Sequence, residues 1–217
     1  MLAVILVVVA CGDDTTVTET SETAAATTSS QGTTTIGPPE TSAAALEFTI
    51  RSPAFEDGGD IDIRYSCEGD NISPKINWTG VPAGAGSLAL TVTDPDAENF
   101  LHWVVWNIPP DSTGFAEDVP GDAELPDGTR QGENEFAPCA APGEATPGGS
   151  AFKTIGYDGP CPGGPHTYVF SVFALSSTID LPVGTAYREV QAAISAPADD
   201  GSLIEKISFS GVFTPGV

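Results

Sequence analysis

The stretch TDPDAENFLHWVVWNIPP, residues 93–110, decides the fold class because an apolar run stands directly beside charged residues. The run from His102 to Ile108 is rich in aromatic and β-branched residues, which is typical of a buried β-strand. A core cannot easily hold the charges of Asp94 and Asp96, which precede it. We therefore expect the aspartates to end one strand and His102 to begin the next, with their polar groups at a common rim.

Short apolar or alternating runs punctuated by Gly, Pro, Asn and Asp continue on both sides of this stretch, from Leu46 to the end of the chain. This pattern is typical of antiparallel β-structure. Strands are predicted at 46–51, 61–66, 87–93, 102–108, 167–175 and 207–213. Together they predict a mainly β fold of two packed antiparallel sheets.

One or two short helices are expected near the C-terminus. Residues 185–194 place apolar side chains at helical spacing behind Thr185, which is predicted to cap the helix. A shorter helical turn is predicted at 200–206. Residues 111–165 are rich in Gly and Pro, and a connection of that length is usually functional or disordered. Within it, 137–152 is interpreted as an inserted surface loop.

Composition favours a single turn-rich domain, expected at 46–217. The chain has 217 residues with 24 Gly, 19 Pro and only 17% charged residues. Its 30 acidic residues against 7 basic ones give a net charge of −23, which argues against nucleic acid as a partner because phosphate binding needs basic residues.

The N-terminus is interpreted as an export signal. An apolar run, residues 2–10, is too short to span a bilayer and ends in a small residue before Cys11, so residues 1–10 are predicted to be a signal peptide. The run VVAC resembles the lipobox of bacterial lipoproteins, which implies lipidation of Cys11 and anchoring to the outer face of the cell membrane. No Lys or Arg precedes the run, so we expect the true translation start upstream; the alternative is a truncated N-terminus with an irrelevant cysteine. Residues 11–45 are predicted to be a disordered Thr/Ser-rich tether.

The two histidines of the chain, His102 and His166, each stand at the start of an apolar strand, where a histidine is most often structural. Strand alternation places His166 and Tyr168 on one face, and Asp94 on the apolar face of the strand at 87–93. Convergence of these strand ends would form a small polar pocket. Nearby carboxylates favour protonated imidazoles, so both histidines are expected to be hydrogen-bond donors in this pocket, with Asp94 orienting them.

Four blocks of sequence carry a family resemblance: CEGDNISPKINWTGVP (67–82), TDPDAENFLHWVVWNIP (93–109), LPDGTRQGENEF (125–136) and GYDGPCPGGPHTYVFSVFAL (156–175). In this order they resemble the phosphatidylethanolamine-binding protein family, most closely its bacterial Raf kinase inhibitor-like (YbhB/YbcL-type) branch. The resemblance implies a fold of two antiparallel sheets and a pocket for phosphate, phosphoryl headgroups or acetate-like anions. Carried over by motif, the pocket residues are Asp94, Asp96, His102, Gly159, Pro160, His166 and Tyr168.

The chain departs from the family pattern in two motifs. The segment AENF, 97–100, replaces the usual continuation of DPDAP and is expected to alter the pocket rim. Thr167 stands where an arginine is common, but alternation points it away from the His166 face, so the pocket chemistry is expected to survive. The insertion at 137–152 precedes the Gly-Pro turn and is expected to cover or extend the site.

Three cysteines remain once Cys11 is assigned to lipid, so they cannot all pair with one another. A disulfide between Cys67 and Cys161, which both lie in family blocks, is favoured slightly over Cys139–Cys161. A zinc site is disfavoured because no C-x-x-C pair occurs.

The expected function is non-enzymatic binding of a small anion, phosphoryl group or phospholipid headgroup at the cell surface, with neither metal nor cofactor. A protease-inhibitory or other protein-interaction role is the alternative. A metal-dependent hydrolase is less favoured, because no H-x-H or H-E-x-x-H spacing accompanies the histidines. A homodimer is left open.

Overall fold

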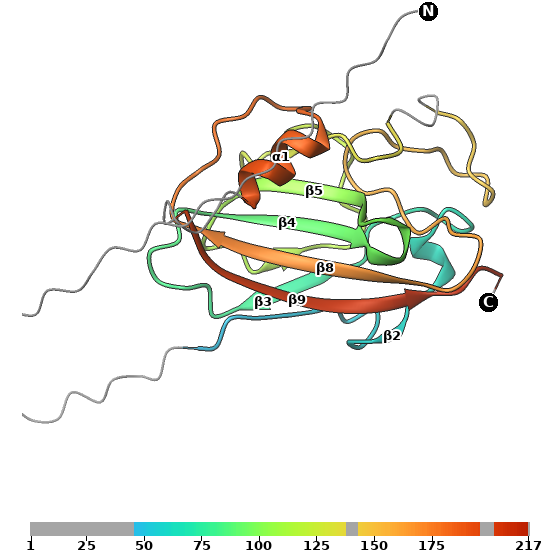
Figure 1. Ribbon diagram of the computed structural model, residues 1–217, viewed down its shortest axis with the longest axis horizontal. Helices are drawn as coiled ribbons and strands as arrows, with labels where there is room; N and C mark the ends of the chain where they lie inside the picture. The colour runs from blue at the N-terminus through green and yellow to red at the C-terminus, as the bar shows by residue number, and fades with distance from the viewer. Residues whose placement is uncertain (1–45, 138–142, 196–201, 217) are drawn as a thin grey trace, which may run out of the picture. The chain divides into compact units, whose positions relative to one another are not determined.

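The computed structural model describes residues 46–137, 143–195 and 202–216, which fold around two sheets and one α-helix (Figure 1). The predictions for the signal peptide, Cys11, the tether and Cys139 concern residues outside these ranges. Within the described ranges, no helix is long and apolar enough to cross a membrane.

The larger sheet has six strands in the order β2-β9-β8-β4-β5-β7, and the smaller has three in the order β1-β3-β6. Neighbouring strands are antiparallel except for β2 and β9. The elements are β1 (Thr49–Arg51), β2 (Gly59–Asp60), η1 (Ile63–Tyr65), β3 (Ile76–Thr79), β4 (Ser87–Asp94), η2 (Pro95–Ala97), β5 (Phe100–Ile108), β6 (Gly114–Phe115), β7 (Arg130–Gln131), β8 (His166–Leu175), α1 (Tyr187–Ile194) and β9 (Leu203–Phe213).

The central strands of the six-stranded sheet are buried on both faces. On one face Trp103 packs against Phe115 of the smaller sheet, with ring centroids 5.5 Å apart. On the other face Trp106 belongs to the cluster that includes Val190 and Ile194 of α1, which crosses the sheet over β5 (Figure 1). Burial on two sides explains why β5 is a continuous apolar run rather than an alternating one.

Most strand predictions are confirmed, but the strand predicted at 61–66 is wrong. Its centre is the 3₁₀ turn η1, because the Asp62 carboxylate accepts a hydrogen bond from the Arg64 N–H and turns the chain locally. The first strand begins only at Thr49, and β3 was not predicted from the sequence.

The C-terminal predictions are partly confirmed. Helix α1 is present, but Thr185 does not cap it: its hydroxyl donates to the carbonyl oxygen of Pro182, and Ala186 occupies the cap position. The helical turn predicted at 200–206 is wrong from Leu203 onward, because these residues already pair with β8 as part of β9.

A disulfide joins Cys67 to Cys161, with their Cα atoms 5.3 Å apart. It links the segment after η1 to the turn that precedes β8. The described part of the predicted insertion, 143–152, lies against the same segment, where the Gly148 N–H donates to the Cys67 carbonyl oxygen at 2.8 Å. This part of the loop therefore supports the disulfide region.

Removal of the disulfide by a Cys67→Ser/Cys161→Ser double substitution is expected to lower the free energy of unfolding. The crosslink spans 94 residues of sequence. Loop-closure entropy for a span of this size gives a loss of about 4 to 5 kcal/mol. Urea unfolding followed by the fluorescence of the buried tryptophans measures it, with Cys139→Ser as the matched control. Equal midpoints for the double variant and the wild type would contradict the stabilising role.

Candidate functional site

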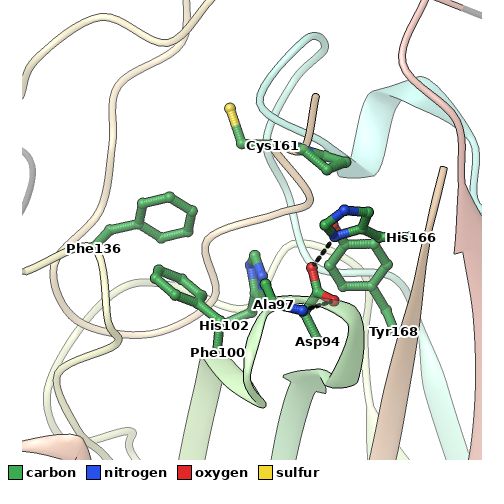
Figure 2. Close-up of a pocket in the computed structure, with 9 residues that line it drawn as sticks. Asp94, Ala97, Phe100, His102, Phe136, Cys161, His166 and Tyr168 are labelled. Atoms are coloured by element: carbon green, nitrogen blue, oxygen red, sulfur yellow. Dashed lines mark hydrogen bonds and ion pairs between the residues drawn. The ribbon is translucent and has the colours of Figure 1, made fainter. Parts of the chain in front are cut away.

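A cavity of about 130 Å³ lies where β4 ends and where β5 and β8 begin (Figure 2). Because both neighbours of β4 run antiparallel to it, the end of β4 lies beside the starts of β5 and β8. This topology brings together the side chains expected to converge. The lining consists of Asp94, Ala97, Phe100, His102, Phe136, Cys161, Pro162, His166 and Tyr168.

Asp94 is almost completely buried, with 3% of its surface exposed. One carboxylate oxygen accepts the backbone N–H groups of Asp96 and Ala97, at 2.9 and 3.1 Å, and so caps η2. The other lies 2.7 Å from Nδ1 of His166, as the dashed line in Figure 2 marks. A buried carboxylate is costly unless such partners satisfy it. Asp94 therefore holds both the turn beyond β4 and the imidazole of β8.

His102 is placed by a β-bulge. Val92 pairs with Trp103 and Thr93 pairs with Leu101, so His102 is an additional residue in β5 with no counterpart in β4. Bulges redirect side chains and occur often beside functional sites. Here the imidazole lines the cavity, and its ring lies edge-on to that of Tyr168 at 5.1 Å.

The environment of His102 differs from the sequence-based expectation. Burial lowers the pKa of His102 to about 4, although the Asp158 carbonyl and the Asp94 charge act in the opposite direction. The ring is therefore neutral near pH 7, and the expectation that nearby carboxylates keep it protonated is wrong. Nδ1 lies 2.8 Å from the Asp158 carbonyl oxygen, which can only accept, so Nδ1 carries the proton and Nε2 is an acceptor.

Tyr168 contributes a buried hydroxyl that has no hydrogen bond of normal geometry to any residue within the described ranges. Burial raises the pKa of Tyr168, and the charge of Asp94 and the interaction of the hydroxyl with its carboxylate act in the same direction, so the phenol keeps its proton. A buried donor without a partner is rare in native proteins. Asp94 is the acceptor that acts on this hydroxyl, in a geometry short of a regular hydrogen bond.

Three of the residues expected at the pocket do not line the cavity. The Asp96 carboxylate instead accepts the Thr167 N–H at 2.7 Å, outside the cavity. The Gly159 N–H donates to Asn71 Oδ1 at 2.8 Å, so it is already engaged and does not point toward an anion. The Pro160 carbonyl oxygen accepts a hydrogen bond from the Cys67 N–H.

Gly159 has a steric role. A Cβ atom at this position would lie 2.1 Å from the Tyr65 carbonyl oxygen, closer than any side chain tolerates. Glycine therefore allows the turn that precedes β8 to lie directly against the segment after η1.

Aromatic residues form the wall that the motif comparison did not predict. Phe100 packs against Phe136 with ring centroids 4.8 Å apart (Figure 2). The ring of Phe152 lies 5.3 Å from that of Phe136. Phe136 comes from the Gly/Pro-rich connection and has no strand periodicity around it that could have placed it. Among the described residues, no group of three or more His, Cys, Asp or Glu is arranged to hold a metal ion.

Asp158 supports His102 from beneath the cavity. Its carboxylate accepts from the Asn71 side-chain amide and from the Lys153 N–H, while its backbone exchanges hydrogen bonds with His102. Burial raises the pKa of Asp158 to about 6, although these donors act in the opposite direction. Acidification therefore lowers the stability of the fold through His102 and raises it through Asp158.

Acidification is expected to destabilise an Asp158→Asn variant more steeply than the wild type. His102 stabilises the fold fully above its unfolded pKa of 6.5 and loses this contribution as the pH falls to about 4. Ionised Asp158 destabilises the fold above about pH 6, and this cost is relieved as the pH falls to 3.8. Asp158→Asn removes only the contribution of Asp158, so the variant lacks the gain in stability that protonation of Asp158 gives the wild type. The free energies of unfolding of the two proteins should therefore diverge by up to about 3 kcal/mol as the pH falls. Urea unfolding from pH 7 to pH 4 tests this; parallel curves would contradict it.

Comparisons with known proteins agree with this geometry. The family model described as phosphatidylethanolamine-binding protein matches residues 51–203. A UPF0098 protein of Methanothermobacter thermautotrophicus is 40% identical over 170 residues, which cover 77% of this chain and 99% of that protein. LppC of Mycobacterium tuberculosis, which is named as a lipoprotein, is 35% identical over 74% of this chain and 72% of its own length.

The fold is also shared with a solved structure. The crystal structure of Escherichia coli YbcL, described as a member of the mammalian PEBP family, has a TM-score of 0.61 and 30% identity. The structural match covers 78% of this chain and 99% of the YbcL chain. The match to the family model extends over most of the folded residues, including the strand ends that line the cavity. The chain belongs to the phosphatidylethanolamine-binding protein family.

Proposed function

We propose that the cavity binds a small oxyanion, either free or as the phosphoryl group of a phospholipid headgroup or other ester, and that it does so without catalysis. Family membership supports ligand binding of this type. The observation that carries the proposal is the buried Tyr168 hydroxyl, which makes no regular hydrogen bond within the described residues and belongs to a side chain that lines the same cavity as Asp94 and His166. A ligand oxygen there would satisfy a group whose burial is otherwise costly.

The charges of the cavity favour an oxyanion that keeps one proton. Asp94 is negative, and both of its oxygens already accept hydrogen bonds. Neutral His102 offers an acceptor at Nε2, which a P–OH group can use and a fully ionised phosphate cannot. A singly charged phosphate, or the monoanion of a phosphate ester, therefore fits the donors and acceptors better than a dianion.

We further propose that the protein is an exported lipoprotein anchored through Cys11. The support is the VVAC run before Cys11 and the similarity to LppC, which is named as a lipoprotein. A diacylglycerol on this cysteine would hold the folded residues near the membrane surface.

Substitution of His166 by alanine is expected to weaken binding of inorganic phosphate roughly ten- to hundredfold, because it removes a hydrogen bond to a charged ligand. Tyr168→Phe, which removes only the hydroxyl, is expected to have a smaller effect in the same direction. Isothermal titration calorimetry measures both. Thr167→Ala is the matched control, since Thr167 lies between the two in β8 but does not line the cavity. Unchanged affinity in both site variants would refute the proposal.

Substitution of Cys11 by serine in the full chain is expected to abolish incorporation of labelled palmitate and to move the protein from the membrane fraction to the soluble fraction. The change removes the sulfur that carries the lipid. Cys139→Ser serves as the control for cysteine loss alone. Continued labelling of the Cys11 variant would show that the anchor is elsewhere.

A further inference from the structure

A second cavity, of about 280 Å³, lies on the other side of the segment 97–100 from the proposed oxyanion site. Its lining consists of Ala97, Glu98, Asn99, Phe100, Glu135, Tyr187, Arg188 and Gln191. It is thus built between the turn beyond β4, the residue before Phe136 and the first turns of α1. The segment 97–100, which departs from the family pattern, supplies four of these lining residues.

The two cavities share a wall. Ala97 and Phe100 line both of them, whereas Glu98 and Asn99 line only the second. The latter two have left-handed backbone conformations, with φ of 57° and 62°, which non-glycine residues rarely adopt. A ligand of the first cavity would therefore have to pass Ala97 and Phe100 to reach the second.

Arg188 gives the second cavity its chemistry. It is the only one of the chain's seven basic residues that lines either cavity. Its guanidinium stacks over the Tyr187 ring at 4.9 Å from the centroid and lies 3.7 Å from Glu135, longer than a hydrogen bond. With 77% of the side chain exposed, its N–H groups remain accessible to a ligand.

Glu135 is occupied by the protein itself. Its other carboxylate oxygen accepts the Leu101 N–H at 2.6 Å, and 19% of the side chain is exposed. It forms a long ion pair with the guanidinium and is itself held by the backbone of β5. A planar guanidinium on such a support matches a carboxylate, which it can bind through two parallel N–H bonds.

We propose that the second cavity is a subsite for a carboxylate carried by the same ligand whose phosphoryl group occupies the first cavity. The ligand class is then a phosphate ester with a carboxylate beyond a short apolar or aromatic linker, which would lie against Phe100. This inference rests on the proposed function of the first cavity. Glu98 lies in the same cavity and opposes the negative group, so Glu98 and Arg188 act on its affinity with opposite signs.

The test compares phenyl phosphate with 4-carboxyphenyl phosphate by calorimetry at constant ionic strength. Wild-type protein is expected to bind the carboxylated compound roughly three- to tenfold more tightly, as an exposed but bidentate ion pair allows. In Arg188→Gln this preference should disappear while the affinity for phenyl phosphate stays the same. In Glu98→Gln the preference should increase.

An unchanged preference in Arg188→Gln would overturn the subsite. Binding of inorganic phosphate without binding of phenyl phosphate would also overturn it, because the path past Phe100 would then be closed. Failure of inorganic phosphate to bind at all would instead refute the oxyanion site, and the subsite with it. The two proposals therefore fail by different observations.

Discussion

The buried carboxylate of Asp94 is the interaction on which the arrangement of the site depends. It accepts two backbone N–H groups of the turn that follows β4, and one imidazole from β8. The turn sets the direction of the segment 97–100, which separates the two cavities, while the imidazole is held facing the first cavity. The Asp94 carboxylate thus connects the end of β4, the start of β8 and the segment 97–100 that lies between the two cavities. Its burial is tolerable only because all three donors are present.

Around this carboxylate, the donors and acceptors of the site rest on rigid elements. His102 is directed by a bulge in a deeply buried strand and is kept neutral by its surroundings. Tyr168 follows His166 on the same face of β8, and its hydroxyl keeps a proton. The disulfide holds the remaining edge through Cys161. A site built in this way is organised before a ligand enters, which reduces the entropy lost on binding.

Periodicity predicted the central strands well because burial on one or both faces leaves a clear apolar pattern in β4, β5 and β8. The same alternation placed His166 and Tyr168 together correctly. The apolar pattern does not reveal local hydrogen bonds such as the one that Asp62 accepts from the Arg64 N–H. The turn at Asp62 was therefore predicted as a strand. The prediction of a helical turn at 200–206 is wrong from Leu203 onward because pairing with β8 overrides the local preference for a helix.

Within the site, the sequence motifs identified the polar residues but not their surroundings. The pKa of His102 depends on how deeply the fold buries the ring, which no spacing reveals. Phe136 and Arg188 reach the cavities from a long connection and from α1, so only the tertiary structure brings them to the strand ends. Gly159 was expected at the pocket, but it does not line the cavity: its N–H is bonded to Asn71, and its lack of a side chain allows the close approach to Tyr65.

The central claim is that the two imidazoles contact one oxyanion while His102 remains neutral. Because the chain has only two histidines, ¹⁵N NMR of the ring nitrogens during a titration with inorganic phosphate tests it directly. The account predicts that both rings shift along one saturable curve, and that His102 keeps the tautomer protonated at Nδ1 throughout. Shifts of neither ring at saturating phosphate, or a His102 ring that is protonated at both nitrogens near pH 7, would contradict it.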